Sequence, residues 1–219
     1  MTTRLILIRH GETEHNVEGR MAGWTDSPLT ELGRSQAERL ARHVADRYRL
    51  DRIYSSPLQR ARHTAEAIGR HVHLRPILRD DLKEIHFGKF EGLTKAEIAA
   101  RFPGMVERRD EPFFEYPGGE STEHFSKRIR HAFRGIISES EGKTVAVVAH
   151  GGVLGAYISD LQSGEPHLWR QFIPRNCAIT EVVVEDGATT LACFDETGHL
   201  EDREVVAPTL AGSALAPAE

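Results

Sequence analysis

The chain has 219 residues, of which 39% are hydrophobic and 28% charged, with a formal net charge of −5. That length is enough to bury a large core, and the acidic balance excludes a global basic field that would attract nucleic acid or an anionic membrane. Cys177 and Cys193 have neither disulfide-framework nor metal-ligand spacing, so a reducing, cytoplasmic location is expected. The apolar run at 5–8 is too short for a signal peptide, and no stretch approaches a membrane span.

Apolar runs and amphipathic segments alternate along the chain, which predicts an α/β fold. In the first part of the chain we predict a strand at 4–8, a helix that begins after Thr30, a strand at 52–54, and a helix to about 71 that is capped by Ser56 with Pro57 at its first position. A loop at 83–92 and a helix at 94–102 follow. In the last part we predict a helix from Ser121 to about 140, a strand at 144–149, a helix at 151–161, and strands at 178–184 and 189–194.

These elements predict one domain over residues 1–206, built as a three-layer αβα sandwich with a mostly parallel central sheet and a small lid insertion. The stretch 103–119 is irregular, aromatic and rich in Pro and Gly, so we place it in a lid spanning about 86–125. The Ala/Pro-rich tail, 207–219, is expected to be disordered.

Two predicted strands end in the same way, with Arg9-His10-Gly11 after one and His150-Gly151-Gly152 after the other. Ligands of parallel sheets bind outside the carboxyl ends of the strands, so both histidines are expected in one crevice. Arg60 falls in the first turn of a helix, where free amides and the helix dipole already favour anions. These residues together predict a phosphate site that contains a nucleophile.

The residue types suit phosphoryl transfer. A neutral imidazole such as His10 is a good nucleophile, and its reference pKa of about 6.5 leaves it mostly unprotonated near neutral pH. Arg9 and Arg60 supply planar forks that match phosphoryl oxygens, and a protonated His150 would add a third cation. The leaving group still needs a proton, which a carboxylic acid on the loop 83–92 could supply.

Six segments resemble, in order, those of the histidine phosphatase superfamily in its phosphoglycerate mutase-like branch. They cover roughly residues 4–195 and read RHGETEHN, DSPLTELG, SSPLQRARHTA, KEIHFGKFEG, PGGES and VVAHGG. The resemblance implies a phosphohistidine nucleophile at His10, a proton donor and acceptor at Glu84, and a phosphate pocket of Arg9, Arg60 and His150. It also implies a phosphoryl contact from Asn16. Gly23, through its backbone amide, and Gly151 are further candidates for binding the substrate. From chemistry alone, Glu12, Asp81 and Glu91 would be equally good acids.

The stretch around Glu84 resembles the phosphatase branch, including α-ribazole and broad-specificity phosphatases, more than the mutases. The expected function is therefore a phosphomonoesterase acting on a small phosphorylated metabolite, with no cofactor, no metal, and neither nucleic acid nor membrane as a partner. A homodimer is left open. The sequence departs from many relatives at Ala22, where they carry glutamine, and this puts a substrate contact there in doubt.

Three other functions remain to be weighed. A cofactor-dependent phosphoglycerate mutase would keep the same nucleophile and acid. A non-catalytic protein that binds phosphorylated ligands would normally have lost one of them. A dinucleotide-binding oxidoreductase is disfavoured, because His150 occupies the first glycine position of the fingerprint and no acidic residue follows at the required distance.

Two further groups of residues are left with open roles. Arg108 and Arg109 could hold a second anionic group of the substrate or could simply be solvated on the lid. Trp24 is a better candidate for lining the pocket than Phe113, Phe114 or Tyr116, which could serve as lid anchors.

Overall fold

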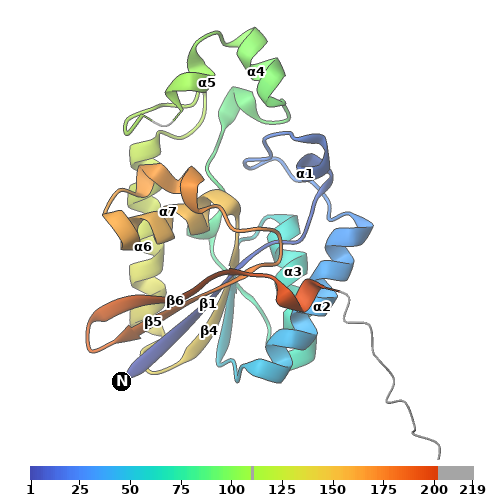
Figure 1. The fold of residues 1–219 in the computed structure, drawn as a ribbon, viewed down its shortest axis with the longest axis vertical. Helices are drawn as coiled ribbons and strands as arrows, with labels where there is room; N and C mark the ends of the chain where they lie inside the picture. The colour runs from blue at the N-terminus through green and yellow to red at the C-terminus, as the bar shows by residue number, and fades with distance from the viewer. Residues whose placement is uncertain (110, 202–219) are drawn as a thin grey trace, which may run out of the picture.

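The computed structural model describes residues 1–109 and 111–201, and its centre is a six-stranded sheet of order β3-β2-β4-β1-β5-β6 (Figure 1). The strands are β1 (Thr2–Arg9), β2 (Arg52–Ser55), β3 (Ile77–Leu78), β4 (Thr144–Ala149), β5 (Ile179–Glu185) and β6 (Ala188–Glu196). The block from β3 to β1 is parallel, whereas β5 and β6 form an antiparallel hairpin beside β1. The predicted α/β architecture is confirmed, with β3 as a short strand that the sequence pattern did not indicate.

The central strands are apolar throughout because both faces of the sheet are buried. Leu5 and Leu7 point into one core with Val147, while Ile6 and Ile8 point into the opposite core. This alternation within a continuous apolar run means that helices must cover each face.

The four longest helices divide between the two faces of the sheet, and the shorter ones lie towards one end of it (Figure 1). They are α1 (Glu14–Glu18), α2 (Glu31–Arg47), α3 (Gln59–Val72), α4 (Lys95–Arg101), α5 (Met105–Arg108), α6 (Thr122–Glu139) and α7 (Gly151–Ser163), with short 3₁₀ segments between some of them. The apolar sides of α2 and α3 fill one core, and those of α6 and α7 fill the other. The three layers are those predicted.

Two of the three predicted helix caps are correct, and the third is wrong. The Thr30 side chain accepts from Gly33 N at the start of α2, and that of Ser121 accepts from His124 N at the start of α6. The Ser56-Pro57 pair does not begin α3, which starts only at Gln59 after Leu58. The Ser56 hydroxyl accepts from Leu58 N at 3.3 Å, just before the helix, and also lies 2.7 Å from His150 Nε2, so it joins this turn to a partner elsewhere in the fold.

A segment between β3 and α6 covers the end of the molecule at which β1, β2 and β4 finish (Figure 1). It contains α4, which matches the predicted helix at 94–102, and α5, which lies within the stretch 103–119 that was predicted to be irregular; two 3₁₀ segments, Asp80–Leu82 and Gly88–Phe90, precede them. Phe114 and Tyr116 are buried and anchor the segment to the core, whereas Phe113 is exposed. Arg108 pairs with Glu111, and the Arg109 guanidinium bonds to Val106 O, so both lid arginines have contacts within the lid.

Other sequence expectations meet the structure at several points. Cys177 and Cys193 are free thiols. None of the helices in the described part of the chain is long and apolar enough to cross a membrane. The tail predicted to be disordered, 207–219, lies outside the described residues.

Candidate active site

The strand register places His10 beside His150. Arg9 pairs with Ala149 across β1 and β4, and His10 N donates to Ala149 O at 3.1 Å. Each histidine is the first residue beyond its strand, and their ring centroids lie 5.3 Å apart. Two rigid, buried strands therefore bring both rings to the crevice, as predicted.

His10 has its Nε2 atom available as a nucleophile. Its Nδ1 lies 2.8 Å from Gly11 O, and a carbonyl only accepts, so Nδ1 carries the proton and Nε2 the lone pair. Burial lowers the pKa of the His10 imidazole well below its ordinary value, and the charges of Arg60 and Arg9 lower it further. The ring is therefore neutral and nucleophilic over the whole physiological range.

The surroundings of His150 disfavour a charged ring, so we do not treat it as the third cation that a protonated His150 would supply. Burial first, and then Arg60 and His10, lower its pKa well below the ordinary value. Ser56 Oγ accepts from Leu58 N at 3.3 Å and lies 2.7 Å from His150 Nε2, to which it can donate its one proton. That arrangement leaves the His150 proton on Nδ1, a buried atom that has no partner among the described residues. His150 therefore offers a neutral N–H donor.

Some of the N–H donors of Arg9 and Arg60 bind backbone carbonyls, and others have no partner among the described residues. Arg9 Nη1 donates to Pro174 O at 2.8 Å, and Arg60 donates to Gly23 O and Thr25 O at 2.7 and 3.1 Å. The Nε atoms of both arginines are buried without a partner within the described residues. Burial lowers both pKa values, yet guanidinium groups stay protonated in proteins. Unsatisfied buried donors with positive charge fit an oxyanion.

Glu84 is the carboxylate that the fold brings to this site. Its Oε2 accepts from Gly152 N, in the first turn of α7, at 3.0 Å, and its Oε1 accepts from Ile85 N at 2.9 Å. A Cβ on Gly152 would overlap the carboxylate, so the glycine is needed for this approach.

The other three carboxylates that chemistry alone allowed are used elsewhere. Glu12 accepts from the Thr30 hydroxyl, and Asp81 binds Arg79. Glu91 accepts from the amides of Trp24, Thr25 and Phe87. The structure therefore separates Glu84 from its rivals.

Asn16 reaches the site by way of a residue that the sequence did not indicate. Its Oδ1 accepts from Thr13 N at 3.1 Å and from Asn176 Nδ2 at 3.2 Å, which leaves its own amide nitrogen as the donor end. Asn176 Nδ2 also donates to His10 O at 2.9 Å. Asn176 thereby ties the nucleophile loop to Asn16.

The loop that carries Gly23 is held by Glu91. Gly23 has φ +54°, and a Cβ there would overlap the Glu91 carboxylate, so glycine is required for two reasons. Three hydrogen bonds join Glu91 to Trp24 N, Thr25 N and Thr25 Oγ1. Ala22 lines the cavity described below with a methyl group, so no side-chain donor is present at that position.

A cavity of about 170 Å³ unites these residues. It is lined by Arg9, His10, Asn16, Arg20, Met21, Ala22, Gly23, Arg60, Glu84, Phe87, Gly151, Gly152, Trp169 and Ile173. All the predicted site residues line it except His150, whose ring is fully buried next to His10. Arg20 is a third cation in the wall; it bonds to Glu18, Glu97 and Gly92 O, and no local pattern singled it out.

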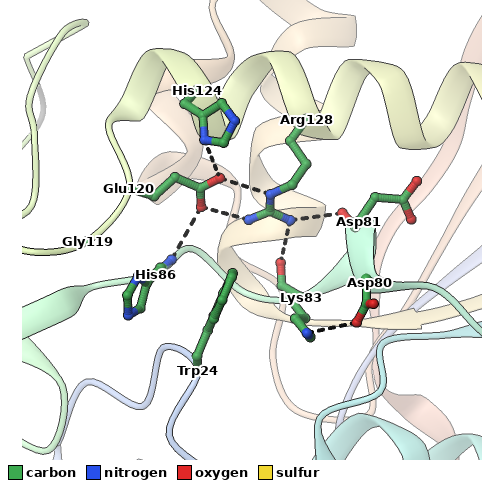
Figure 2. A pocket seen from close by; sticks show the side chains of 9 residues that line it. All are labelled: Trp24, Asp80, Asp81, Lys83, His86, Gly119, Glu120, His124 and Arg128. Carbon is green, nitrogen blue, oxygen red and sulfur yellow. Dashed lines mark hydrogen bonds and ion pairs between the residues drawn. The ribbon is translucent and has the colours of Figure 1, made fainter.

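A wider cavity, of about 560 Å³, lies next to the first and is drawn in Figure 2. Trp24 lines this second cavity and donates from Nε1 to Glu84 O at 2.7 Å. His86 stacks on the indole with ring centroids 4.7 Å apart, and Lys83 Nζ lies 5.0 Å from its ring centroid. Trp24 thus braces the backbone of Glu84 from the side of the wider cavity.

The described residues contain no group of three or more His, Cys, Asp or Glu side chains placed to hold a metal ion. The site consists instead of two neutral imidazoles, fixed guanidinium groups and one carboxylate around a small cavity. Such a constellation suits covalent phosphoryl transfer with nitrogen as the nucleophile.

Comparison with known proteins agrees with that chemistry. The model of the histidine phosphatase superfamily (branch 1) matches residues 5–197. The phosphatase PhoE of Bacillus subtilis is 34% identical over 166 residues, which cover 76% of this chain and 81% of PhoE. A metal-independent phosphoserine phosphatase of Arabidopsis thaliana is 37% identical over 158 residues, covering 70% of this chain and 66% of that protein.

The solved structure of Bacillus stearothermophilus YhfR superposes with a TM-score of 0.84 at 34% identity, covering 91% of this chain and all of that one. Three mycobacterial relatives, 36% identical over 200 residues, are longer, and the chain spans 55% of their length. The chain belongs to the histidine phosphatase superfamily.

Proposed function

We propose that this protein is a phosphate monoesterase that works through a phosphorylated His10. The observation that carries the proposal is the convergence of a neutral, buried imidazole having a free Nε2 with two guanidinium Nε atoms that lack partners among the described residues. A tetrahedral phosphoryl group supplies acceptors for those donors and an electrophile for that lone pair.

The reaction has two steps. In the first, His10 Nε2 attacks phosphorus, the P–O bond to the alcohol breaks, and Glu84 gives its proton to the departing oxygen. Arg9, Arg60, Asn16 and the Nδ1–H of His150 bind the phosphoryl oxygens. In the second, Glu84 removes a proton from water, the water oxygen bonds to phosphorus, and the P–N bond breaks to release phosphate and neutral His10.

The substrate class is a small phosphorylated metabolite. The phosphoryl group occupies the cavity of about 170 Å³, so the alcohol portion must extend towards the lid, which we assign to residues 86–125 of a domain over 1–206. We propose that water reaches the phosphohistidine past this lid, so that hydrolysis exceeds transfer between two positions of a phosphoglycerate.

Hydrolysis of a panel of phosphate monoesters, run in EDTA with phosphoglycerate mutase activity measured alongside, tests the proposal. We expect hydrolysis that persists in EDTA and exceeds mutase turnover. The His10→Ala variant should lose covalent turnover, because no other group replaces the nucleophile, whereas His131→Ala, at an exposed position of α6, should retain it. A His10→Ala protein with wild-type hydrolysis, or activity that needs a divalent ion, would contradict the proposal.

A further inference from the structure

Arg128 binds the backbone of the segment that carries Glu84 (Figure 2). From α6, its Nη1 donates to Asp81 O and Lys83 O at 2.9 and 2.8 Å, and its Nη2 donates to Glu84 O at 3.2 Å. One guanidinium therefore gathers three carbonyl oxygens spread over four residues. Only 14% of the Arg128 side chain is exposed, so solvent competes weakly for these bonds.

Glu120 fixes the orientation of Arg128. The two side chains form a bidentate pair, with Nε–Oε1 at 2.9 Å and Nη2–Oε2 at 2.8 Å, and the Glu120 side chain is 5% exposed. Glu120 also binds directly to the segment that carries Glu84 (residues 81–86, here called the acid segment). His86 N donates to Glu120 Oε2, and Glu120 N donates to His86 O at 2.8 Å. A planar fork held at both edges has little freedom to rotate.

The Arg128–Glu120 pair, here called the clamp, binds the backbone of the acid segment, whereas the reactive carboxyl of Glu84 points to the phosphoryl cavity. Arg128 and Trp24 Nε1 both bind the Glu84 carbonyl, while the Glu84 carboxylate meets Gly152 N at the phosphoryl cavity. Arg128 lines the wider cavity and is absent from the lining of the phosphoryl cavity. Its contacts with the reacting groups therefore run through the Glu84 segment, and its charge acts in addition through space, where it helps to lower the pKa of His150.

We propose that Arg128, oriented by Glu120, is a positioning residue that holds Glu84 in the geometry needed for proton transfer to the leaving alcohol. The inference rests on the proposed role of Glu84. General acid catalysis demands hydrogen-bond contact between acid and leaving oxygen, so a loop free to shift by an ångström loses it.

Two substrates that differ in their need for an acid test this inference. p-Nitrophenyl phosphate releases a stable phenolate without protonation, whereas an alkyl phosphate such as glycerol 2-phosphate needs a proton. For Arg128→Met we expect kcat/KM on the alkyl ester to fall by roughly 10²-fold, the usual scale of general acid catalysis, and kcat/KM on the aryl ester to fall by less than about threefold. Because kcat/KM ends at the phosphorylation of His10, the later role of Glu84 as a base does not enter.

Arg130→Met is the matched control. Arg130 lies on the same helix and makes its own bidentate pair with Asp160, at 2.9 and 2.6 Å, without touching the acid segment. Both substrates should keep near wild-type kcat/KM in this variant. Arg128→Lys separates charge from geometry, since it keeps the cation but not the fork; it should still show a selective loss on the alkyl ester.

Several outcomes would overturn the inference. Equal losses on the two esters in Arg128→Met would mean that Arg128 supports the pocket or the fold, and no loss would mean that the clamp is dispensable. If that variant does not fold, Glu120→Gln, which removes the charge opposite Arg128, must show the same selectivity. Glu84→Gln distinguishes the two proposals: a non-selective loss there removes the acid role itself, whereas a selective loss there without one in the Arg128 variants removes only the positioning role.

Discussion

At the residue scale, the site depends on where a few protons sit. The Gly11 carbonyl sets the tautomer of His10, so the first ring presents a lone pair. The Ser56 hydroxyl can donate to Nε2 of His150, and in that arrangement the second ring presents its Nδ1–H. The same type of side chain thus acts as nucleophile in one case and as hydrogen-bond donor in the other. Both roles need neutral rings, which burial and the nearby guanidinium groups ensure.

The neutrality of His150 predicts a particular dependence of stability on pH. In the unfolded chain its pKa returns to about 6.5, while in the native protein it is lowered well below that value. As the pH falls below about 6.5, the unfolded chain therefore gains a proton that the native ring does not, and the free energy of unfolding decreases by up to about 1.4 kcal/mol per pH unit for each such ring.

The comparison of wild type with His150→Gln by denaturant unfolding, from pH 7.5 to 5 in phosphate-free buffer, measures this contribution. The variant should lose stability less steeply below pH 6.5, whatever its absolute stability. Parallel curves would show that the native His150 ring takes up protons as readily as the unfolded one.

The sequence was enough to predict which residues reach the site where a strand places the side chain there. It was not enough where the hydrogen-bond partner lies far away in the sequence. Arg9, His10 and His150 follow from two apolar strands and their ends. Ser56 did not, because the Ser-Pro pattern equally suits a helix start, and only the packing of β4 beside β2 brings His150 to its hydroxyl.

The same limit applies to the residues that hold the loops of the site in place. Glu91, Glu120 and Arg128 lie in or near the motifs quoted from the sequence, but apart from the ion pair between Glu120 and Arg128 most of their partners are backbone amides and carbonyls. Backbone groups leave no residue-specific signal, so these roles became visible only with the loops in place.

At the scale of elements, helix α2 packs against the nucleophile loop through two glycines. A Cβ on Gly11 would lie 2.5 Å from Gly33 O, and a Cβ on Gly33 would overlap Glu12 O. These contacts involve backbone on both sides, so neither partner can turn away. The first turn of α2 can therefore lie directly against the residues that follow His10.

Gly33→Ala should consequently destabilise the protein by about 1–3 kcal/mol, the usual cost of overpacking, and should lower the turnover number through displacement of the nucleophile loop. Gly135→Ala is the matched control inside a helix: its nearest atom is the flexible tip of Arg79 at 3.3 Å, and the added Cβ favours the helix. Thermal unfolding and steady-state assays of both variants measure the changes in stability and in turnover number. Equal stability and turnover in the two variants would show that the loop can retreat from α2.

At the scale of the whole molecule, an acidic protein has a cationic site with unsatisfied donors at the carboxyl ends of its central strands. The net charge is −5, yet Arg9, Arg60 and Arg20 line one small cavity. Arg9 ends β1 and Arg60 lies in the first turn of α3, so elements from different parts of the fold meet at these charges. Without an anion, repulsion between them and unsatisfied buried donors oppose folding; with one, the same groups join the elements together.

An oxyanion should therefore stabilise the entire fold and not only its pocket. Orthovanadate at about 100 times its dissociation constant contributes roughly 2.7 kcal/mol by mass action, which for a chain of this size raises Tm by about 5–10 °C. Sodium chloride at matched ionic strength should not reproduce the shift, because screening of exposed charges supplies no ligand to the buried Nε atoms.

Two arginines on α3 make the test specific. Arg60→Met removes a cavity cation and should lose most of the vanadate-induced rise in Tm. Arg62→Met alters an arginine that pairs with Glu66 and does not line the cavity, so it should retain the full rise. Differential scanning calorimetry of the three proteins with and without vanadate gives the answer: equal rises in both variants would place the anion outside the cavity. A rise confined to wild type and Arg62→Met would connect the stability of the whole molecule to the same charges that are proposed to bind the phosphoryl group.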